Sequence, residues 1–294
     1  YTDFGLQLGE KSVKENQLSV KIIALEHAEF YHFGSNEDLL RSTRALHERV
    51  VDQRGIWHKK IKPSSDIFVQ NSVTDVQFRP ENGSIWIENS CIPNTWTLHD
   101  HHLLTGIPQN TWNIEIPACI CLDFIPIRFQ KWCIRPYGFR DCFRGDFSDS
   151  STCWMNSPAK QWFANRGFSE ESYREFNGKD LFECRIFPVV GENEIGSEYL
   201  SWLIGSATME NMPNKDFVRK WLSGERLSAR EIIGKANLRR ISALRKQNLD
   251  RSLAAMAVNK SQSVFYQLDL EHLAAKYKAA RFPLPPPLEA GSSV

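Results

Sequence analysis

Tyr31, His32, Gly34 and Ser35 stand close together, where a β-rich segment gives way to a helical pattern. Ser35, with Asp38 three residues later, has the form of a helix capping box. The first amides of a helix lack intrahelical partners and favour an anion. A phosphate could bind there while Tyr31 and His32 hydrogen-bond a sugar hydroxyl. On these residues alone an ordinary capped helix is the preferred interpretation, because every helix start has this chemistry.

A second group of candidate residues is the run His99-Asp100-His101-His102. Histidine and aspartate bind zinc, but structural zinc sites draw their ligands from separate parts of a chain. On a strand, His99 and His101 would share one face, and Asp100 and His102 the other. We therefore expect a polar, solvated edge and no metal site. A general base for acyl transfer is a weaker alternative use of these histidines.

A third group lies in residues 135–145, where Arg135, Arg140 and Arg144 stand beside Tyr137. Guanidinium groups can clamp a phosphate or carboxylate through paired hydrogen bonds. The preferred interpretation is structural: an ordered loop that closes the end of the β-rich segment.

Several common catalytic motifs are absent from the chain. It has no phosphate loop of the G-x-x-x-x-G-K-[ST] type, no G-x-G-x-x-G after a strand and no G-x-S-x-G elbow. Asp3-Phe4-Gly5 matches the kinase magnesium tripeptide, but no other kinase motif accompanies it. No catalytic residue and no metal ligand can be named from the sequence.

An eighteen-residue repeat is the main structural signal. Phe68-Val69-Gln70-Asn71-Ser72 and Trp86-Ile87-Glu88-Asn89-Ser90 match in type at this spacing. Extending it gives two apolar columns: Ile67, Ile85, Leu103, Cys121 and Phe68, Trp86, Leu104, Leu122. Eighteen residues form one turn of a three-sided parallel β-helix, expected here to be left-handed, with Asn-Ser, Pro-Asn and Thr-Gly pairs at its corners. The alternative is a short antiparallel sheet in chance register.

Helical signals surround this repeat, so the expected class is α+β. Two strands are expected within residues 18–33. Helices are expected from Ser35 to about Gly55, between Ser157-Pro158 and Gly167, after the capping box Ser228–Glu231, and from Asp269. The capping box should open one basic amphipathic helix that continues through Leu244. The prolines of residues 281–294 indicate a stiff linker.

Composition narrows the class of protein. Lysines and arginines number 36 and aspartates and glutamates 35, so the chain lacks the basic excess of nucleic-acid or membrane-surface binders. Seven cysteines without a C-x-x-C pair indicate a reduced, cytoplasmic protein. The most apolar stretch, residues 117–127, is too short to span a bilayer. Because the chain starts with Tyr1 instead of Met, we expect it to belong to a longer polypeptide.

Several segments together resemble the L-fucokinase/GDP-fucose pyrophosphorylase family, in the C-terminal part of its guanylyltransferase region. They are Tyr31–Ser35, Asp52-Gln53-Arg54, Phe68–Asn71, Trp86–Ser90, Leu104–Pro108, Arg135–Gly138, Ala257–Ser261 and Ser263–Leu268. Their joint order along nearly the whole chain is more specific than any single segment.

The resemblance implies a reaction and a division of the chain. L-fucose 1-phosphate and GTP would give GDP-L-fucose and pyrophosphate, with Mg²⁺ held by ligands outside this chain. Tyr31, His32, Gly34 and Ser35 would line the sugar-phosphate pocket. Residues 1–60 would end a nucleotidyltransferase core, 61–150 form the β-helix, 151–280 a helical region and 281–294 a linker.

Further domains upstream and downstream, the latter an L-fucokinase, are implied as well. The isolated chain is then expected to be inactive, because it lacks a phosphate loop. The alternative function is a non-catalytic β-helix scaffold or oligomerisation module, and a homo-oligomer is possible under either function.

Overall fold

The computed structural model describes residues 28–48, 66–205 and 214–258. The chain divides into two compact units, Tyr1–His32 and Phe33–Val294. Of the first unit only residues 28–32 are described, and they form no helix or strand. Of the two strands expected within residues 18–33, the second is wrong, because residues 28–33 form no strand. The first lies outside the described residues. No helix in the described ranges combines the length and apolar character needed to cross a membrane.

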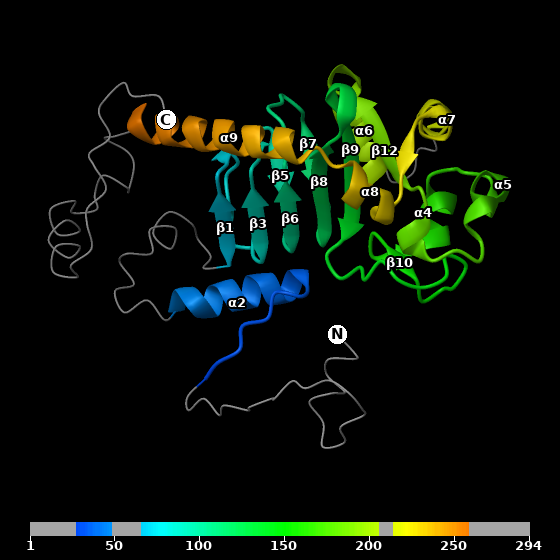
Figure 1. The fold of residues 1–294 in the computed structure, drawn as a ribbon, viewed down its shortest axis with the longest axis horizontal. Helices are drawn as coiled ribbons and strands as arrows, with labels where there is room; N and C mark the ends of the chain where they lie inside the picture. The colour runs from blue at the N-terminus through cyan, green and yellow to red at the C-terminus, as the bar shows by residue number, and fades with distance from the viewer. Residues whose placement is uncertain (1–27, 49–65, 206–213, 259–294) are drawn as a thin grey trace, which may run out of the picture. The chain divides into compact units, whose positions relative to one another are not determined.

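Short parallel strands stack into a three-sided β-solenoid of about three turns (Figure 1). One side is formed by β1 (Ile67–Gln70), β3 (Ile85–Glu88), β6 (His102–Thr105) and β8 (Ile120–Pro126). The second pairs β2 (Val73–Thr74) with β4 (Cys91–Ile92), and the third pairs β5 (Trp96–Leu98) with β7 (Ile114–Ile116). All these pairs are parallel, so the antiparallel alternative is wrong. The handedness of the coil stays a prediction.

The predicted register holds for the first step and shifts by one residue at the second. Ile67 lies opposite Ile85, as the eighteen-residue spacing requires. Ile85, however, lies opposite His102 instead of Leu103, so the coil between them has seventeen residues. Leu104 and Leu122 restore the spacing of eighteen. Because side chains alternate between the two faces of a strand, this one-residue difference places His102 in the inner column.

Left-handed backbone corners fix the coils. Three such residues follow β1, β3 and β6, namely Asn71, Asn89 and Gly106. Three more precede β3, β6 and β8, namely Ser84, His101 and Cys119. Glycine and asparagine tolerate this conformation best, which explains the predicted Asn-Ser and Thr-Gly corners. Ser72 Oγ also accepts a hydrogen bond of 3.0 Å from the Ser90 amide, and so joins neighbouring coils at one corner. These corner predictions are confirmed.

The solenoid sheet continues into antiparallel strands. β9 (Lys131–Gly138) pairs along the whole of β8, β12 (Phe187–Gly191) pairs with β9, and β13 (Arg226–Leu227) pairs with β12. The sheet order is β1-β3-β6-β8-β9-β12-β13. Arg135 to Gly138 therefore lie in a strand, and the loop predicted for them is wrong. The 3-10 turn η2 (Arg128–Gln130) joins β8 to β9.

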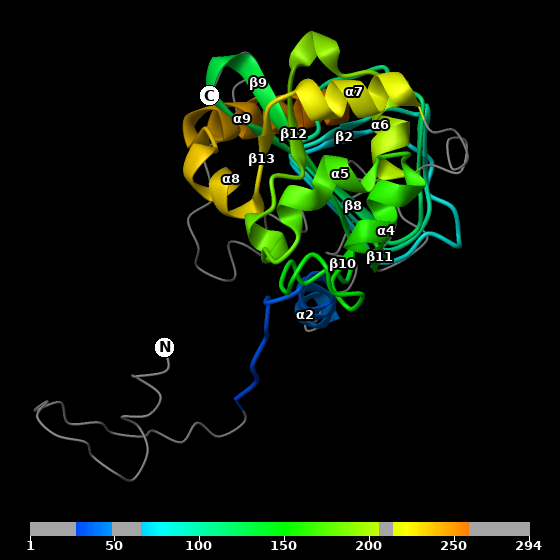
Figure 2. The same ribbon diagram turned by 90° about the vertical axis from the view of Figure 1, so that its right-hand side faces the viewer.

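The helices differ in part from the sequence expectations. They are α2 (Asn36–Glu48), α4 (Ala159–Asn165), α5 (Glu170–Tyr173), α6 (Ser197–Ile204), α7 (Lys215–Ser223), α8 (Ala229–Lys235) and α9 (Leu238–Val258). The minor elements are β10 (Cys153–Trp154), β11 (Ser157–Pro158) and the 3-10 turns η3 (Arg174–Phe176), η4 (Leu181–Glu183) and η5 (Glu192–Glu194). Figure 2 shows α4 to α7 gathered beside the extended sheet.

The local capping predictions have mixed outcomes. Ser228 forms the predicted capping box with Glu231 and opens α8. The helix expected to continue through Leu244 is instead two helices, α8 and α9, because the chain turns at Ala236. Ser157 was expected to cap a helix but lies in β11, and α4 has no side-chain cap. The end near Gly55, the helix from Asp269 and the proline-rich linker lie outside the described residues.

Aromatic side chains fill the core beside the extended sheet. Trp154, Phe163, Trp202 and Trp221 are each almost completely buried. Trp154 and Trp162 have ring centroids 4.3 Å apart. Burial of each such ring stabilises the fold by about 2–3 kcal/mol. The helices of residues 159–223 and the solenoid sheet therefore share one hydrophobic core.

Candidate functional site

The turn predicted to hold a sugar phosphate spans both compact units. Tyr31 and His32 end the first unit, whereas Gly34 and Ser35 lie in the second. The Tyr31 hydroxyl donates to the Glu29 carboxylate. The exposed His32 ring stacks on Phe30, with centroids 6.0 Å apart. The assignment of these four residues to the pocket stays a prediction.

The start of α2 supplies its own negative charge. Ser35 Oγ accepts from the Asp38 amide at 3.1 Å and donates to the Asp38 carboxylate at 2.9 Å, which confirms the predicted cap. Glu37 and Asp38 both lie in the first turn, where they interact favourably with the helix dipole. An added phosphate at the Ser35 amides would meet these two carboxylates. An anion is therefore better placed farther along the helix.

A groove lies farther along α2. Its volume is about 370 Å³, and its walls include Arg41, Arg44, Ser84, His101 and Phe139 together with the carboxylates Glu37 and Asp66. The Asn36 side chain anchors the start of α2 by donating to the Phe139 carbonyl at 2.8 Å. Arg41 and Arg44 are three residues apart and so lie on the same side of the helix. Ser84 and His101 come from one column of solenoid corners.

The charged groups of the groove are held by exposed ion pairs. Arg44 lies 3.3 Å from Asp66, and Arg41 pairs with Asp38. His101 Nδ1 lies 2.8 Å from Asp100, and its ring meets the Phe139 ring edge-on at 5.2 Å. Exposed pairs of this kind stabilise a protein weakly, by about 1 kcal/mol or less. A phosphate, which arginine binds through paired hydrogen bonds, can compete with them.

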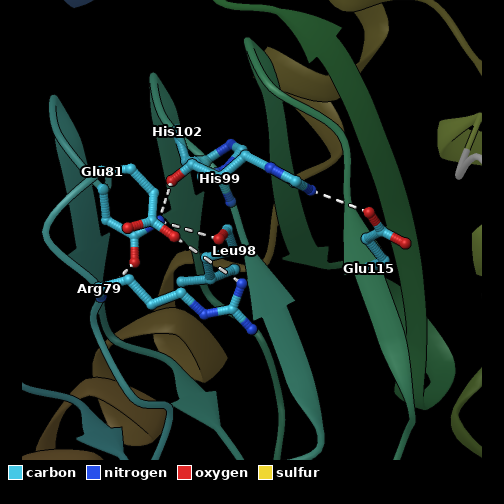
Figure 3. A network of polar contacts seen from close by, with 7 residues as sticks. Arg79, Glu81, Leu98, His99, His102 and Glu115 are labelled. Carbon is cyan, nitrogen blue, oxygen red and sulfur yellow. Dashed lines mark hydrogen bonds and ion pairs between the residues drawn. The ribbon is translucent and has the colours of Figure 1, made fainter.

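The histidine run separates into the buried His102 and two carboxylate-bound side chains, His99 and His101. Figure 3 shows His102 and the contact of His99 with Glu115. His102 is fully buried, so the solvated edge expected here is wrong for this residue. Its Nδ1 donates to the Ile120 carbonyl at 2.8 Å, and its Nε2 accepts from the His99 amide at 3.0 Å. Burial lowers the pKa of His102 to about 4. With both nitrogens occupied, His102 cannot act as a general base.

Neighbouring polar groups fix the same corner. The His99 ring lies 2.9 Å from Glu115 Oε1 on β7. The buried Asn82 amide donates to the carbonyls of Leu98 at 2.9 Å and His99 at 2.7 Å. Figure 3 shows that these contacts run between successive coils. The side chains of the histidine run therefore hold neighbouring coils in place, which disfavours acyl transfer as their function.

Among the side chains that the structure describes, no three of His, Cys, Asp or Glu come together in a way that could hold a metal ion. The magnesium requirement stays a prediction about parts beyond these residues.

The arginine segment has a structural role at Arg135. Arg135 Nε donates to Asp123 Oδ2 at 2.8 Å across the β8–β9 pair. Thr105 Oγ1 donates to the other oxygen of Asp123 at 2.6 Å, and Asp123 is almost completely buried. The Arg135 guanidinium also lies 5.0 Å from the centre of the Tyr137 ring. These contacts occupy the fork that a phosphate clamp would need.

Comparison with known proteins agrees with the family resemblance of the sequence motifs. Residues 12–192 match the fucose pyrophosphorylase domain family. The chain belongs to this family. It is also 38% identical over 283 residues to an L-fucokinase/L-fucose-1-P guanylyltransferase of Bacteroides fragilis. That alignment covers 94% of this chain and 29% of the relative, so the chain spans less than a third of the relative's length. No solved structure matches the chain.

The family membership confirms the resemblance inferred from the motifs and gives the α2 groove its context. Sequence reasoning did not select Arg41, Arg44 or Ser84, and it considered His101 only as part of the histidine run. The spacing of the two arginines was a detectable signal. The corner position of His101 was not, because it depends on the seventeen-residue coil.

Proposed function

We propose that this chain is part of a guanylyltransferase that forms GDP-L-fucose from L-fucose 1-phosphate and GTP, fused to an L-fucokinase. The fucose pyrophosphorylase match and the guanylyltransferase relative support this function. The observation that carries it at the residue level is the α2 groove. There Arg41, Arg44 and His101 line one groove with Glu37 and Asp66, and the two arginines are the groups that would bind a phosphate.

In this reaction a phosphate oxygen of the sugar phosphate attacks the α-phosphorus of GTP. The new P–O bond forms as the α–β bridging bond breaks, and pyrophosphate leaves with the bonding electron pair. Arg41 and Arg44 would orient the phosphate, and Ser84 and His101 would hydrogen-bond sugar hydroxyls. Mg²⁺, where bound, neutralises charge on the phosphates. The described residues bind and orient the sugar phosphate and take no part in proton transfer.

The turn at Tyr31 to Ser35 belongs to the same proposal. Tyr31, His32, Gly34 and Ser35 would line the sugar-phosphate pocket, as the family resemblance implies, and Ser35 also caps the helix that carries Arg41 and Arg44. The two arginines bind the phosphate group in this arrangement, so that the capping serine is left to stabilise the helix.

Steady-state kinetics of the full-length enzyme test the proposal. Arg44→Gln should raise the KM for L-fucose 1-phosphate about ten- to a hundredfold, since a lost charged contact costs about 1.5–3 kcal/mol. The KM for GTP should stay unchanged. Arg79→Gln is the matched control, because the Arg79 side chain is exposed and its guanidinium lies 3.9 Å from Glu81, a weak surface pair.

His32→Ala and Tyr31→Phe extend the same assay to the predicted turn. Each should raise the KM for the sugar phosphate and leave that for GTP close to its original value. If Arg44→Gln matches Arg79→Gln, the α2 groove is not the sugar-phosphate site. If the two turn variants also keep wild-type kinetics, the scaffold alternative becomes the better account of this chain.

A further inference from the structure

Helix α9 has one side on the sheet and one exposed, basic side. It crosses the ends of the solenoid strands (Figure 1). The Arg240 guanidinium lies over the Trp132 ring, 4.5 Å from its centre. Asn248 Nδ2 donates to the Asn89 carbonyl at 2.8 Å. Because an α-helix repeats every 3.6 residues or about 1.5 Å per residue, these two contacts place Ser242 on the opposite side, where it is exposed.

Three cations are the helical neighbours of Ser242. Arg239 precedes it by three residues, and Arg245 and Lys246 follow it by three and four, the spacings at which side chains of one helix meet. All three are exposed, and within the part of the chain that the structure describes none of them forms an ion pair. The helix has five arginines and lysines but a single acidic residue, Asp250. Its outer side therefore carries an excess of positive charge.

The residues before Ser242 match the substrates of one class of protein kinase. Arg239 and Arg240 stand three and two residues ahead of the serine, in the sequence Arg-Arg-Ile-Ser. Kinases that select basic substrates bind such arginines through acidic side chains of their substrate groove. Arg245 and Lys246 lie on the other side of the serine and do not belong to this recognition pattern.

A second serine has basic residues at similar positions, but its place in the fold is unfavourable. Ser223 follows Arg219 and Lys220 by four and three residues and is the last residue of α7. Its hydroxyl donates to the Lys220 carbonyl at 3.4 Å. The free carbonyls of a helix C-terminus repel a phosphate, and Arg219 is already paired with Asp216. Ser242 lies in the second turn of α9, away from such carbonyls.

We propose that Ser242 is a phosphorylation site for a protein kinase that selects basic substrates, and that Arg239, Arg245 and Lys246 hold the phosphate. The Ser242 Oγ attacks the γ-phosphorus of ATP, and the new O–P bond forms as the bond to the β,γ-bridging oxygen breaks. ADP leaves with the bonding electron pair, and the hydroxyl proton passes to a base of the kinase.

The phosphate changes the charge of the helix surface. It carries close to two negative charges and three acceptor oxygens, which suit the three neighbouring cations. The outer side of α9 then changes from basic to nearly neutral. The site lies on a different helix from the α2 groove and does not depend on the guanylyltransferase function.

Incubation of the 294-residue chain with ATP and the catalytic subunit of cyclic-AMP-dependent protein kinase tests the site. Mass spectrometry should place a single phosphoryl group on Ser242. Kinases bind extended substrates, so α9 must open locally, and transfer should be slower than to a free peptide of residues 236–246. Arg239→Gln should lower the rate about tenfold. Ser242→Ala should abolish the transfer, whereas the matched control Ser223→Ala should leave it unchanged.

A second measurement separates the contacts of the phosphate from recognition by the kinase. Hydrogen exchange of the α9 amides should slow about threefold to tenfold on phosphorylation, and added salt should weaken this protection. The double variant Arg245→Gln/Lys246→Gln should accept the phosphoryl group at the original rate, because both residues lie outside the recognised sequence. It should gain little protection.

Three results would overturn the proposal. One is the absence of transfer to a chain whose thermal unfolding shows it to be folded, while the free peptide is phosphorylated. Another is transfer that persists in Ser242→Ala, which would place the modified residue elsewhere. The third is faster exchange of α9 in the phosphorylated chain, which would show that the phosphate disrupts the helix.

Discussion

His102 shows how a single residue can acquire a role that its neighbours in sequence conceal. It belongs to a run of polar residues, yet it occupies the inner column of the solenoid in line with Ile67 and Ile85. Burial of its ring disfavours the charged form, and the hydrogen bond that Nε2 accepts from the His99 amide is available to the neutral form alone. A buried histidine of this kind makes stability depend on pH.

The stability of the fold should fall on acidification below about pH 6.5. The pKa of His102 is lowered from 6.5 to about 4, so between these values the unfolded chain binds more protons than the folded chain. The unfolding free energy then decreases as pH falls, by about 2 kcal/mol from this residue between pH 7 and pH 5. Urea unfolding of wild type and His102→Gln at both pH values measures this slope.

The comparison depends on the slope alone, because His102→Gln also loses packing and is expected to be less stable at every pH. A shallower dependence in the variant supports the assignment. Equal dependence in both proteins would show that His102 titrates normally in the fold.

At the scale of the element, the solenoid coil depends on stacking of like residues. Ile67 and Ile85 are fully buried and lie in register on neighbouring strands, whereas Gln70 of the same sheet is exposed. Strands of two to four residues are not stable in isolation, so each coil depends on stacking against its neighbours.

Ile85→Asp should destabilise the chain by several kcal/mol, about 3–5, because it buries an unpaired carboxylate between two coils. Gln70→Asp introduces the same side chain at the exposed end of β1 and should cost less than about 1 kcal/mol. Thermal unfolding of both variants gives the comparison. Similar melting temperatures for the two would contradict the stacked-coil arrangement.

At the scale of the whole molecule, the seven-stranded sheet has a different helix at each end of its solenoid strands. Helix α2 lies near the starts of the solenoid strands and α9 crosses their ends (Figure 1). The antiparallel strands β9, β12 and β13 continue the sheet and pack against the aromatic core. The described residues contain no phosphate loop.

The 294-residue chain by itself should therefore not bind GTP measurably. Without the amides of a phosphate loop, the triphosphate has no cradle. Titration calorimetry with GTP checks this, with the full-length enzyme as the positive control. Micromolar affinity in the isolated chain would contradict the expectation and would place a nucleotide site within it.

The sequence alone determined the parallel coil, its corners and the caps at Ser35 and Ser228. These features follow from side-chain periodicity and from contacts within about four residues, which a single sequence displays directly. Only the tertiary structure decided the seventeen-residue coil, the burial of His102 and the pairing of Arg135 with Asp123. The tertiary structure also decided where α9 attaches, since Asn89 and Asn248 meet across 159 residues. Such contacts depend on the burial free energy of partners remote in sequence, which local patterns do not contain.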